Sequence, residues 1–155
     1  MMNTIRTHTP DETVALGKKI GRTVVDGTVI ALTGDLGSGK TAFTRGIADG
    51  IGLVEDYIPS PSYTLINHYS GPGPDLYHVD LYRLTDSQEA EDLGLDEVLH
   101  RHGVVVIEWA EKFGPRFWGE DLEVRFTVSG ETDRDIVVIA HGPIGDSIVS
   151  ALLDG

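Results

Sequence analysis

The chain has 155 residues, a length that predicts a single domain over residues 1–155 and leaves no room for a separate substrate domain. Its formal net charge of −13 at pH 7 argues against general attraction to nucleic acid or to an anionic membrane. The absence of cysteine excludes disulfides and thiolate chemistry, and the lack of a long apolar run argues against a membrane span, so we expect a cytoplasmic protein.

Apolar segments and turn residues alternate along the chain in the way that is typical of an α/β fold. The apolar runs 29–32 and 104–107 contain no polar residue, which predicts parallel strands that are covered on both faces. We expect a mixed, mostly parallel central sheet that is flanked by helices and extended by antiparallel hairpins. In chain order the predicted elements are a short strand around Ile5, a helix from about Pro10 to the low twenties, a strand over 28–33, a helix over 41–50, strands over 63–69 and 76–80, a helical segment over 86–97, a strand over 104–107, strands over 122–128 and 136–140, and a helix over 144–153.

The first predicted helix carries two signals of its own. Thr9 can cap its first turn, with Pro10 at the first helical position and Glu12 able to reach back to the cap. Gly17 and Gly21 lie one turn apart, which costs helix propensity but lets another backbone approach closely. We interpret the two glycines as packing residues.

The segment after the first buried strand is rich in glycine. Residues 34–41 read Gly-Asp-Leu-Gly-Ser-Gly-Lys-Thr, a complete G-x-x-x-x-G-K-[ST] pattern between a strand and a helix. In such a phosphate loop the backbone N–H groups face a β-phosphate, and the following helix adds its positive end. Lys40 would neutralise the β- and γ-phosphates, and the Thr41 hydroxyl would bind Mg²⁺. The predicted nucleotide-binding residues are Asp35, Leu36, Gly37, Ser38, Gly39, Lys40, Thr41 and Ala42.

Two carboxylates are placed to complete the Mg²⁺ shell. Glu108 follows the buried run 104–107, and Asp80 ends the predicted strand 76–80. Both therefore lie at the carboxyl end of a strand, where α/β proteins bind their ligands. The alternative for each is an ordinary acid that is exposed at a strand end. Their presence together with the phosphate loop favours the metal site.

Two sequence features bear on the class of nucleotide-binding protein to which this chain belongs. No lysine is followed two residues later by aspartate, so the [NT]-K-x-D element that reads guanine is absent. The arginines after the predicted loop helix are scattered, which weakens the case for the arginine-bearing lid of a small-molecule kinase. Three classes remain open: an ATPase that acts with a partner, a P-loop small-molecule kinase, and a nucleotide-dependent binding module without turnover.

Four motifs occur in order along the chain. They are the phosphate loop 34–41, Ser-Pro-Ser-Tyr-Thr-Leu at 60–65, His-Val-Asp-Leu-Tyr-Arg-Leu at 78–84 and Ile-Glu-Trp at 107–109. In this order and spacing the chain resembles the bacterial TsaE (YjeE) ATPases over nearly its whole length. The resemblance implies a single-domain P-loop NTPase that uses ATP and Mg²⁺, is a weak ATPase, and serves the formation of N6-threonylcarbamoyladenosine at position 37 of tRNA.

The same resemblance implies partners and site residues. The family works with the TsaB–TsaD complex, while TsaC makes the threonylcarbamoyl adenylate, so we expect this chain to act on tRNA only indirectly. Carried over by motif, the catalytic residues are Lys40, Asp80 and Glu108, the metal ligands are Thr41, Glu108 and Asp80, and a switch-like loop near the γ-phosphate contains Ser60, Ser62 and Thr64.

Other features of the sequence have two interpretations each. Trp109 is either a core aromatic or a contact for the nucleotide or a partner, and Arg83 either reaches phosphate or pairs with one of the many acids. His78 is expected to be a hydrogen-bonded structural residue rather than a base. The segment 86–97 carries acids and no base, so it forms either a solvated helical face or a docking face for a basic partner.

Overall fold

The computed structural model describes residues 2–53, 66–92, 94–99, 103–114 and 117–154. None of the helices in these ranges is long and apolar enough to cross a membrane. The elements follow the predicted order, except that the predicted helical segment 86–97 is two short helices. Their bounds are β1 (Met2–Thr7), α1 (Pro10–Gly21), β2 (Val29–Gly34), α2 (Lys40–Ile51), β3 (Ile66–Tyr69), β4 (Leu76–Asp80), α3 (Ser87–Asp92), α4 (Leu95–Leu99), β5 (Val104–Glu108), the 3-10 helix η1 (Ala110–Phe113), β6 (Leu122–Val128), β7 (Arg134–Ala140) and α5 (Pro143–Asp154).

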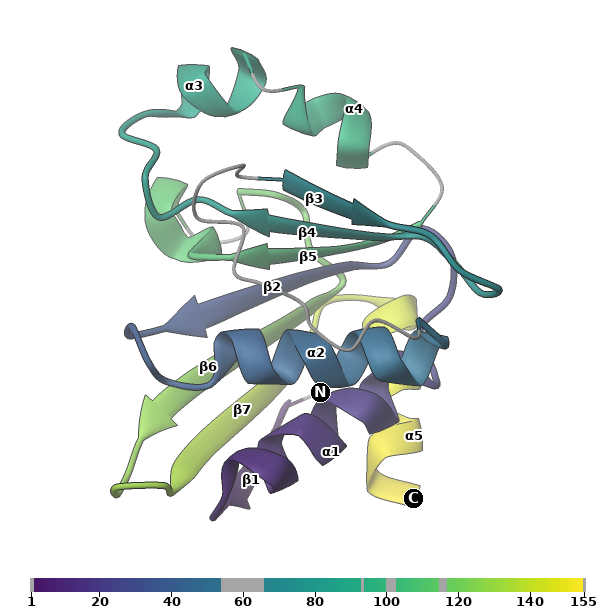
Figure 1. Ribbon diagram of the computed structural model, residues 1–155, viewed down its shortest axis with the longest axis vertical. Helices are drawn as coiled ribbons and strands as arrows, with labels where there is room; N and C mark the ends of the chain where they lie inside the picture. The colour runs from purple at the N-terminus through teal and green to yellow at the C-terminus, as the bar shows by residue number, and fades with distance from the viewer. Residues whose placement is uncertain (1, 54–65, 93, 100–102, 115–116, 155) are drawn as a thin grey trace.

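The strands form one sheet in the order β1-β7-β6-β2-β5-β4-β3 (Figure 1). Its centre is parallel, because β2 pairs in parallel with both β5 and β6, and β5 with β4. The hairpins β3–β4 and β6–β7 are antiparallel, and β1 joins β7 antiparallel at the edge. The predicted fold class, a mixed and mostly parallel sheet with hairpin additions, is confirmed. As a consequence β2, β4 and β5 end at the same edge of the sheet.

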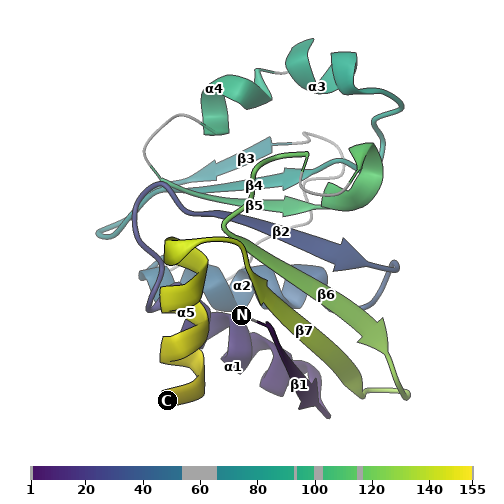
Figure 2. The same cartoon turned by 180° about the vertical axis from the view of Figure 1, so that it is seen from behind.

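Both faces of the central strands are covered. Along β2, Ile30 and Leu32 belong to a hydrophobic cluster beneath α1, α2 and α5, whereas Val29 and Ala31 belong to a second cluster on the opposite face. Alternate side chains of a strand point to opposite faces, so the absence of polar residues in this strand follows from its double burial. Figures 1 and 2 show α1, α2 and α5 grouped on one side of the molecule, and α3 and α4 beyond the β3 edge of the sheet.

The start of α1 has the predicted cap with one difference. The Glu12 backbone N–H donates to the Thr9 hydroxyl at 3.1 Å. The Glu12 carboxylate reaches back to the cap as predicted, because its Oε2 accepts from the Thr9 hydroxyl at 3.5 Å. The difference is that its Oε1 also accepts from the backbone N–H of His8 at 3.3 Å. The cap fixes the chain where it passes from β1 into α1, and the first turn of α1 borders the cavity described below.

Helices α1 and α2 pack backbone against backbone, as Gly17 and Gly21 predict. A methyl group added to Gly17 would collide with the Phe43 carbonyl oxygen of α2. A methyl group on Gly46 of α2 would collide with the Val14 carbonyl oxygen of α1. The glycines therefore hold α2, and with it the end of the phosphate loop, at a fixed depth against α1.

Replacing Gly46 by alanine is expected to lower the free energy of unfolding by about 3 kcal/mol, the upper end for overpacking, since only backbone atoms could give way. Urea denaturation measures the change. The neighbouring Arg45 is exposed, and Arg45→Ala should stay within about 0.5 kcal/mol of the unaltered chain. Equal stability of Gly46→Ala and the unaltered chain would show that the two helices are not in backbone contact.

Candidate nucleotide-binding site

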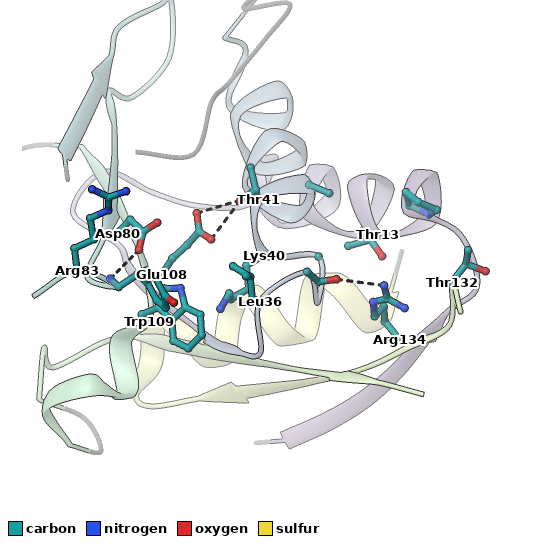
Figure 3. A pocket seen from close by; sticks show the side chains of 15 residues that line it. Thr13, Leu36, Lys40, Thr41, Asp80, Arg83, Glu108, Trp109, Thr132 and Arg134 are labelled. Carbon is teal, nitrogen blue, oxygen red and sulfur yellow. Dashed lines mark hydrogen bonds between the residues drawn. The ribbon is translucent and has the colours of Figure 1, made fainter. Parts of the chain in front are cut away.

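A cavity of about 400 Å³ opens at the carboxyl edge of the parallel strands, around the phosphate loop. Figure 3 shows side chains from both halves of the chain converging on it. The lining residues come from α1, the phosphate loop and the start of α2, the ends of β4 and β5 with the residues that follow them, and the β6–β7 turn with the start of β7: Pro10, Thr13, Leu36, Gly37, Gly39, Lys40, Thr41, Ala42, Asp80, Tyr82, Arg83, Glu108, Trp109, Thr132 and Arg134.

The phosphate loop depends on its glycines. Gly34, Gly37 and Gly39 have φ angles of 142°, 77° and 108°, a region that other residues rarely adopt. The Ser38 backbone N–H donates to the Asp35 carbonyl at 3.1 Å and closes the turn. Because Gly39 precedes α2 and supplies no side-chain cap, the first N–H groups of α2 remain available to an anion.

Lys40 is almost fully buried, with 4% of its surface exposed. Its Nζ donates to the Gly34 carbonyl and lies 3.6 Å from the centroid of the Trp109 ring. Burial lowers the pKa of Lys40, and nearby carboxylates oppose that change. These carboxylates belong to Glu108, Glu111, Asp80 and Asp35. Burial removes water from the ammonium group, which strengthens its attraction for a phosphate that enters the cavity.

Trp109 has a strained backbone at this site. Its φ of 61° is the one positive φ of a non-glycine residue in the part of the chain that the structure describes. Such a conformation costs on the order of 1 kcal/mol and is typical of functional sites. Trp109 follows directly after Glu108, and its indole ring contacts both the Lys40 ammonium and the Tyr82 ring, whose centroid is 5.0 Å away. Trp109 thus borders the second hydrophobic cluster and the cavity at once.

The two predicted carboxylates lie side by side at the ends of neighbouring strands. Asp80 and Glu108 are paired in register, and each is 3% exposed, so neither is an ordinary exposed acid at a strand end. Asp80 Oδ1 accepts the Tyr82 backbone N–H at 2.9 Å. Glu108 is held on both sides, because Oε1 accepts from the Thr41 hydroxyl at 3.4 Å and Oε2 is hydrogen-bonded to His78 Nε2.

His78 is fully buried and hydrogen-bonded, as we expected. Its Nδ1 has no hydrogen-bond partner among the described residues, so the ring makes its one hydrogen bond through Nε2. Placing the proton on Nε2 lets it donate to the carboxylate. This contact fixes the orientation of Glu108, whose oxygens Oε1 and Oε2 lie 3.4 and 3.5 Å from the Thr41 hydroxyl.

These oxygens suit a magnesium ion. The Thr41 hydroxyl and the carboxylates of Glu108 and Asp80 are hard oxygen ligands of the kind that Mg²⁺ prefers. All three residues line the cavity, and Figure 3 shows the carboxylates on the Thr41 side of Lys40. Two buried carboxylates in register would repel each other, and a divalent cation between them would remove that cost. The residues present therefore fit the ion.

The other predicted site residues are distributed as follows. Arg83 lines the cavity, whereas Asp35 is exposed and Ser38 is buried within the loop, and neither of these two is among the lining residues. Within the predicted loop 34–41 they close the turn instead. The predicted switch residues Ser60, Ser62 and Thr64 lie outside the described residues.

The sequence did not point to two residues that hold the phosphate loop, nor to Pro10, Thr13, Tyr82 and Thr132 as residues of the site. Glu111 Oε2 accepts the Gly34 backbone N–H at 3.3 Å and so holds the start of the phosphate loop. Arg134 Nε donates to the Ser38 carbonyl at 3.1 Å from the start of β7. Glu111 could have been suspected from the sequence, because it follows Glu108 by about one helical turn. Nothing in the sequence connects Arg134 to residues 37 and 38.

Comparison with known proteins gives one consistent family. The model of the family described as threonylcarbamoyl adenosine biosynthesis protein TsaE matches residues 7–136. A Bacillus subtilis protein named tRNA threonylcarbamoyladenosine biosynthesis protein TsaE is 41% identical over 88% of this chain and 85% of its own length. The Haemophilus influenzae protein of the same name is 35% identical over 97% of this chain and 98% of its own. The crystal structure of YdiB from Bacillus subtilis superposes with a TM-score of 0.79 at 33% identity, covering 99% of this chain and 95% of that one.

Proposed function

The chain belongs to the TsaE family. From this premise we propose that it binds ATP and Mg²⁺ and serves tRNA threonylcarbamoyladenosine biosynthesis as a slow ATPase that acts with the TsaB–TsaD complex. The observation that supports ATP binding is the desolvated Lys40 beside an uncapped helix start and two buried carboxylates. A second cavity, lined by Asp26, Gly73, Pro74 and Asp75, contains no basic side chain.

The chain's own groups would bind and orient the triphosphate. The first N–H groups of α2 donate to phosphate oxygens, and Lys40 exchanges its contact with the Gly34 carbonyl for the negative charge of the β- and γ-phosphates. Magnesium bound by Thr41, Glu108 and Asp80 would neutralise charge on the same phosphates. His78 keeps the Glu108 carboxylate in place throughout, because its imidazole is buried and cannot turn away.

The nucleoside belongs at the other end of the cavity. The carboxylates occupy the side of the loop toward β4 and β5, so the γ-phosphate lies on that side. The opposite end is bordered by Pro10 and Thr13 of α1 and by Thr132 and Arg134 of the β6–β7 hairpin. We assign the ribose and base to this end. In Figure 3 it lies on the opposite side of the phosphate loop from Glu108.

Slow turnover follows from the chemistry of the lining residues. The carboxylates among the described lining residues are Asp80 and Glu108, and both are proposed as metal ligands. That leaves no carboxylate there to position or activate water, a function that other P-loop enzymes give to a separate residue or to a partner protein. We therefore expect the TsaB–TsaD complex to stimulate hydrolysis, and we expect this chain to act on tRNA only indirectly.

The experiment that tests this function measures phosphate release with and without TsaB and TsaD, and screens nucleosides and small alcohols for phosphorylated product. Phosphate release stimulated by TsaB and TsaD supports the proposal. A phosphorylated product formed without them would identify a small-molecule kinase instead. Stable ATP binding without release in either condition would identify a binding module.

Tryptophan fluorescence offers an independent measurement of ATP binding. Of the two tryptophans, Trp109 lies 3.6 Å from the Lys40 ammonium, whereas Trp118 is buried in the second hydrophobic cluster. ATP is expected to change the emission because it alters the charge beside the Trp109 ring. The change should disappear in Trp109→Phe and persist in Trp118→Phe, the matched control. A change that persists in Trp109→Phe would contradict the proposed phosphate position.

A further inference from the structure

Arg134 joins two segments that are far apart in the sequence. From the first position of β7 its guanidinium donates to the phosphate loop, through Nε to the Ser38 carbonyl at 3.1 Å and through Nη2 to the Gly37 carbonyl at 3.3 Å. Its Nη1 donates to carbonyls of the β6–β7 turn, the closest at 2.8 Å on Asp133. Figure 3 shows this side chain directed at the loop.

Arg134 makes no ion pair with any residue that the structure describes. In the described part of the chain, its polar contacts are backbone carbonyls and none is a carboxylate. Arg6 and Arg125 differ, since each contacts a carboxylate, Asp135 at 2.8 Å and Glu123 at 2.7 Å. An arginine that donates hydrogen bonds to several carbonyls holds the backbone in place, because its donors form a rigid, planar fork.

The contact with Ser38 has a consequence for the next residue. The carbonyl of one residue and the N–H of the next lie in one plane and point in opposite directions. Since Arg134 draws the Ser38 carbonyl toward β7, the Gly39 N–H is directed the other way. Gly39 has a φ of 108° and lacks a side chain that could otherwise resist rotation of this peptide. The orientation of this N–H thus depends on a contact from outside the loop.

We propose that Arg134 is a positioning residue that clamps the Gly37–Gly39 peptides to the β6–β7 hairpin and so presets the phosphate loop for its anion. The expected effect on nucleotide affinity rests on the proposed function, whereas the clamp itself is a property of the nucleotide-free chain. The clamped loop would bind the phosphates equally well in the ground state and in the transition state. Loss of the clamp should therefore weaken nucleotide binding and leave the turnover of bound nucleotide unchanged.

Arg134→Met and Arg134→Lys test the clamp, with Arg125→Met as the matched control on the same hairpin. Hydrogen exchange of the amides of residues 37–39 in the nucleotide-free chain should be faster in both Arg134 variants and unchanged in the control. ATP and ADP affinity should fall by about tenfold, the effect of losing hydrogen bonds to a charged group, with kcat at saturation unchanged. Lysine should not restore affinity, because a single ammonium cannot bridge both loop carbonyls and the hairpin.

Three results would overturn the clamp: unchanged loop exchange in Arg134→Met, full affinity in Arg134→Lys, or a fall in kcat with KM unchanged. Thermal unfolding of each variant separates loss of the clamp from loss of the fold, since the clamp predicts faster exchange in the loop while the amides of β2 and β5 stay protected. Failure of the unaltered chain to bind nucleotide would contradict the proposed function, and the exchange result would still decide the clamp.

Discussion

Lys40→Ala is expected to abolish measurable binding of ATP and ADP. Lys40 is 4% exposed, and its ammonium contacts the Gly34 carbonyl and the Trp109 ring, so the charge is largely desolvated where the phosphates would lie. Loss of a buried charge that pairs with a phosphate costs on the order of 3–5 kcal/mol, or more than a hundredfold in affinity. Isothermal titration calorimetry with ATP and Mg²⁺ measures the loss.

The control for this variant is Lys18→Ala. Lys18 lies on α1 and contacts Asp49 on α2 at the surface, at 3.1 Å. Its removal should leave affinity unchanged, which separates a specific phosphate contact from a general loss of positive charge. Affinity of Lys40→Ala within a few-fold of the unaltered chain would show that the phosphates do not lie at this lysine.

Glu108→Gln is expected to retain ATP binding and to lose hydrolysis by on the order of a hundredfold or more in kcat, the range seen when one catalytic electrostatic contact is removed. Glutamine still accepts the His78 hydrogen bond through its carbonyl oxygen, so the fold is preserved, but it lacks the charge that binds Mg²⁺. Glu108→Ala should have the same effect on turnover with some loss of stability. Phosphate release in the presence of TsaB and TsaD measures both variants.

Glu123→Gln is the matched control for Glu108→Gln. Glu123 is also a glutamate paired with a histidine, because Oε2 lies 3.1 Å from His141 Nε2, but it is not among the cavity residues. Its variant should hydrolyse ATP at the normal rate. Normal turnover by Glu108→Gln would refute the metal assignment, since a buried carboxylate that binds the ion cannot be neutralised without effect.

The parts of the site that lie within one short segment could be predicted from the sequence. The phosphate loop 34–41 is local, so its glycines and Lys40 appear as one pattern. Glu108 and Asp80 were found because each ends a strand, and parallel pairing then brings them into register. Gly17 was interpreted as a packing residue from its spacing to Gly21, and the close approach of α2 confirms this.

The parts that depend on the path of the chain could not be predicted. Arg134 reaches residues 37 and 38 only because the β6–β7 hairpin returns beside the phosphate loop. The Trp109 ring that contacts Lys40 belongs to a residue with a positive φ, a conformation that local propensity disfavours for tryptophan. The predicted helical segment 86–97 is divided because Gly94 has a φ of 77°, a conformation that ends helices.

A crystal structure of this chain with a non-hydrolysable ATP analogue and Mg²⁺ tests the central claim most directly. We expect the β-phosphate on the backbone N–H groups at the start of α2, Lys40 Nζ on the β- and γ-phosphates, and the ion in contact with Thr41 and Glu108. The base should lie beside Thr13 and Thr132. An analogue bound elsewhere, or bound here with Lys40 still on the Gly34 carbonyl and away from phosphate, would contradict the account.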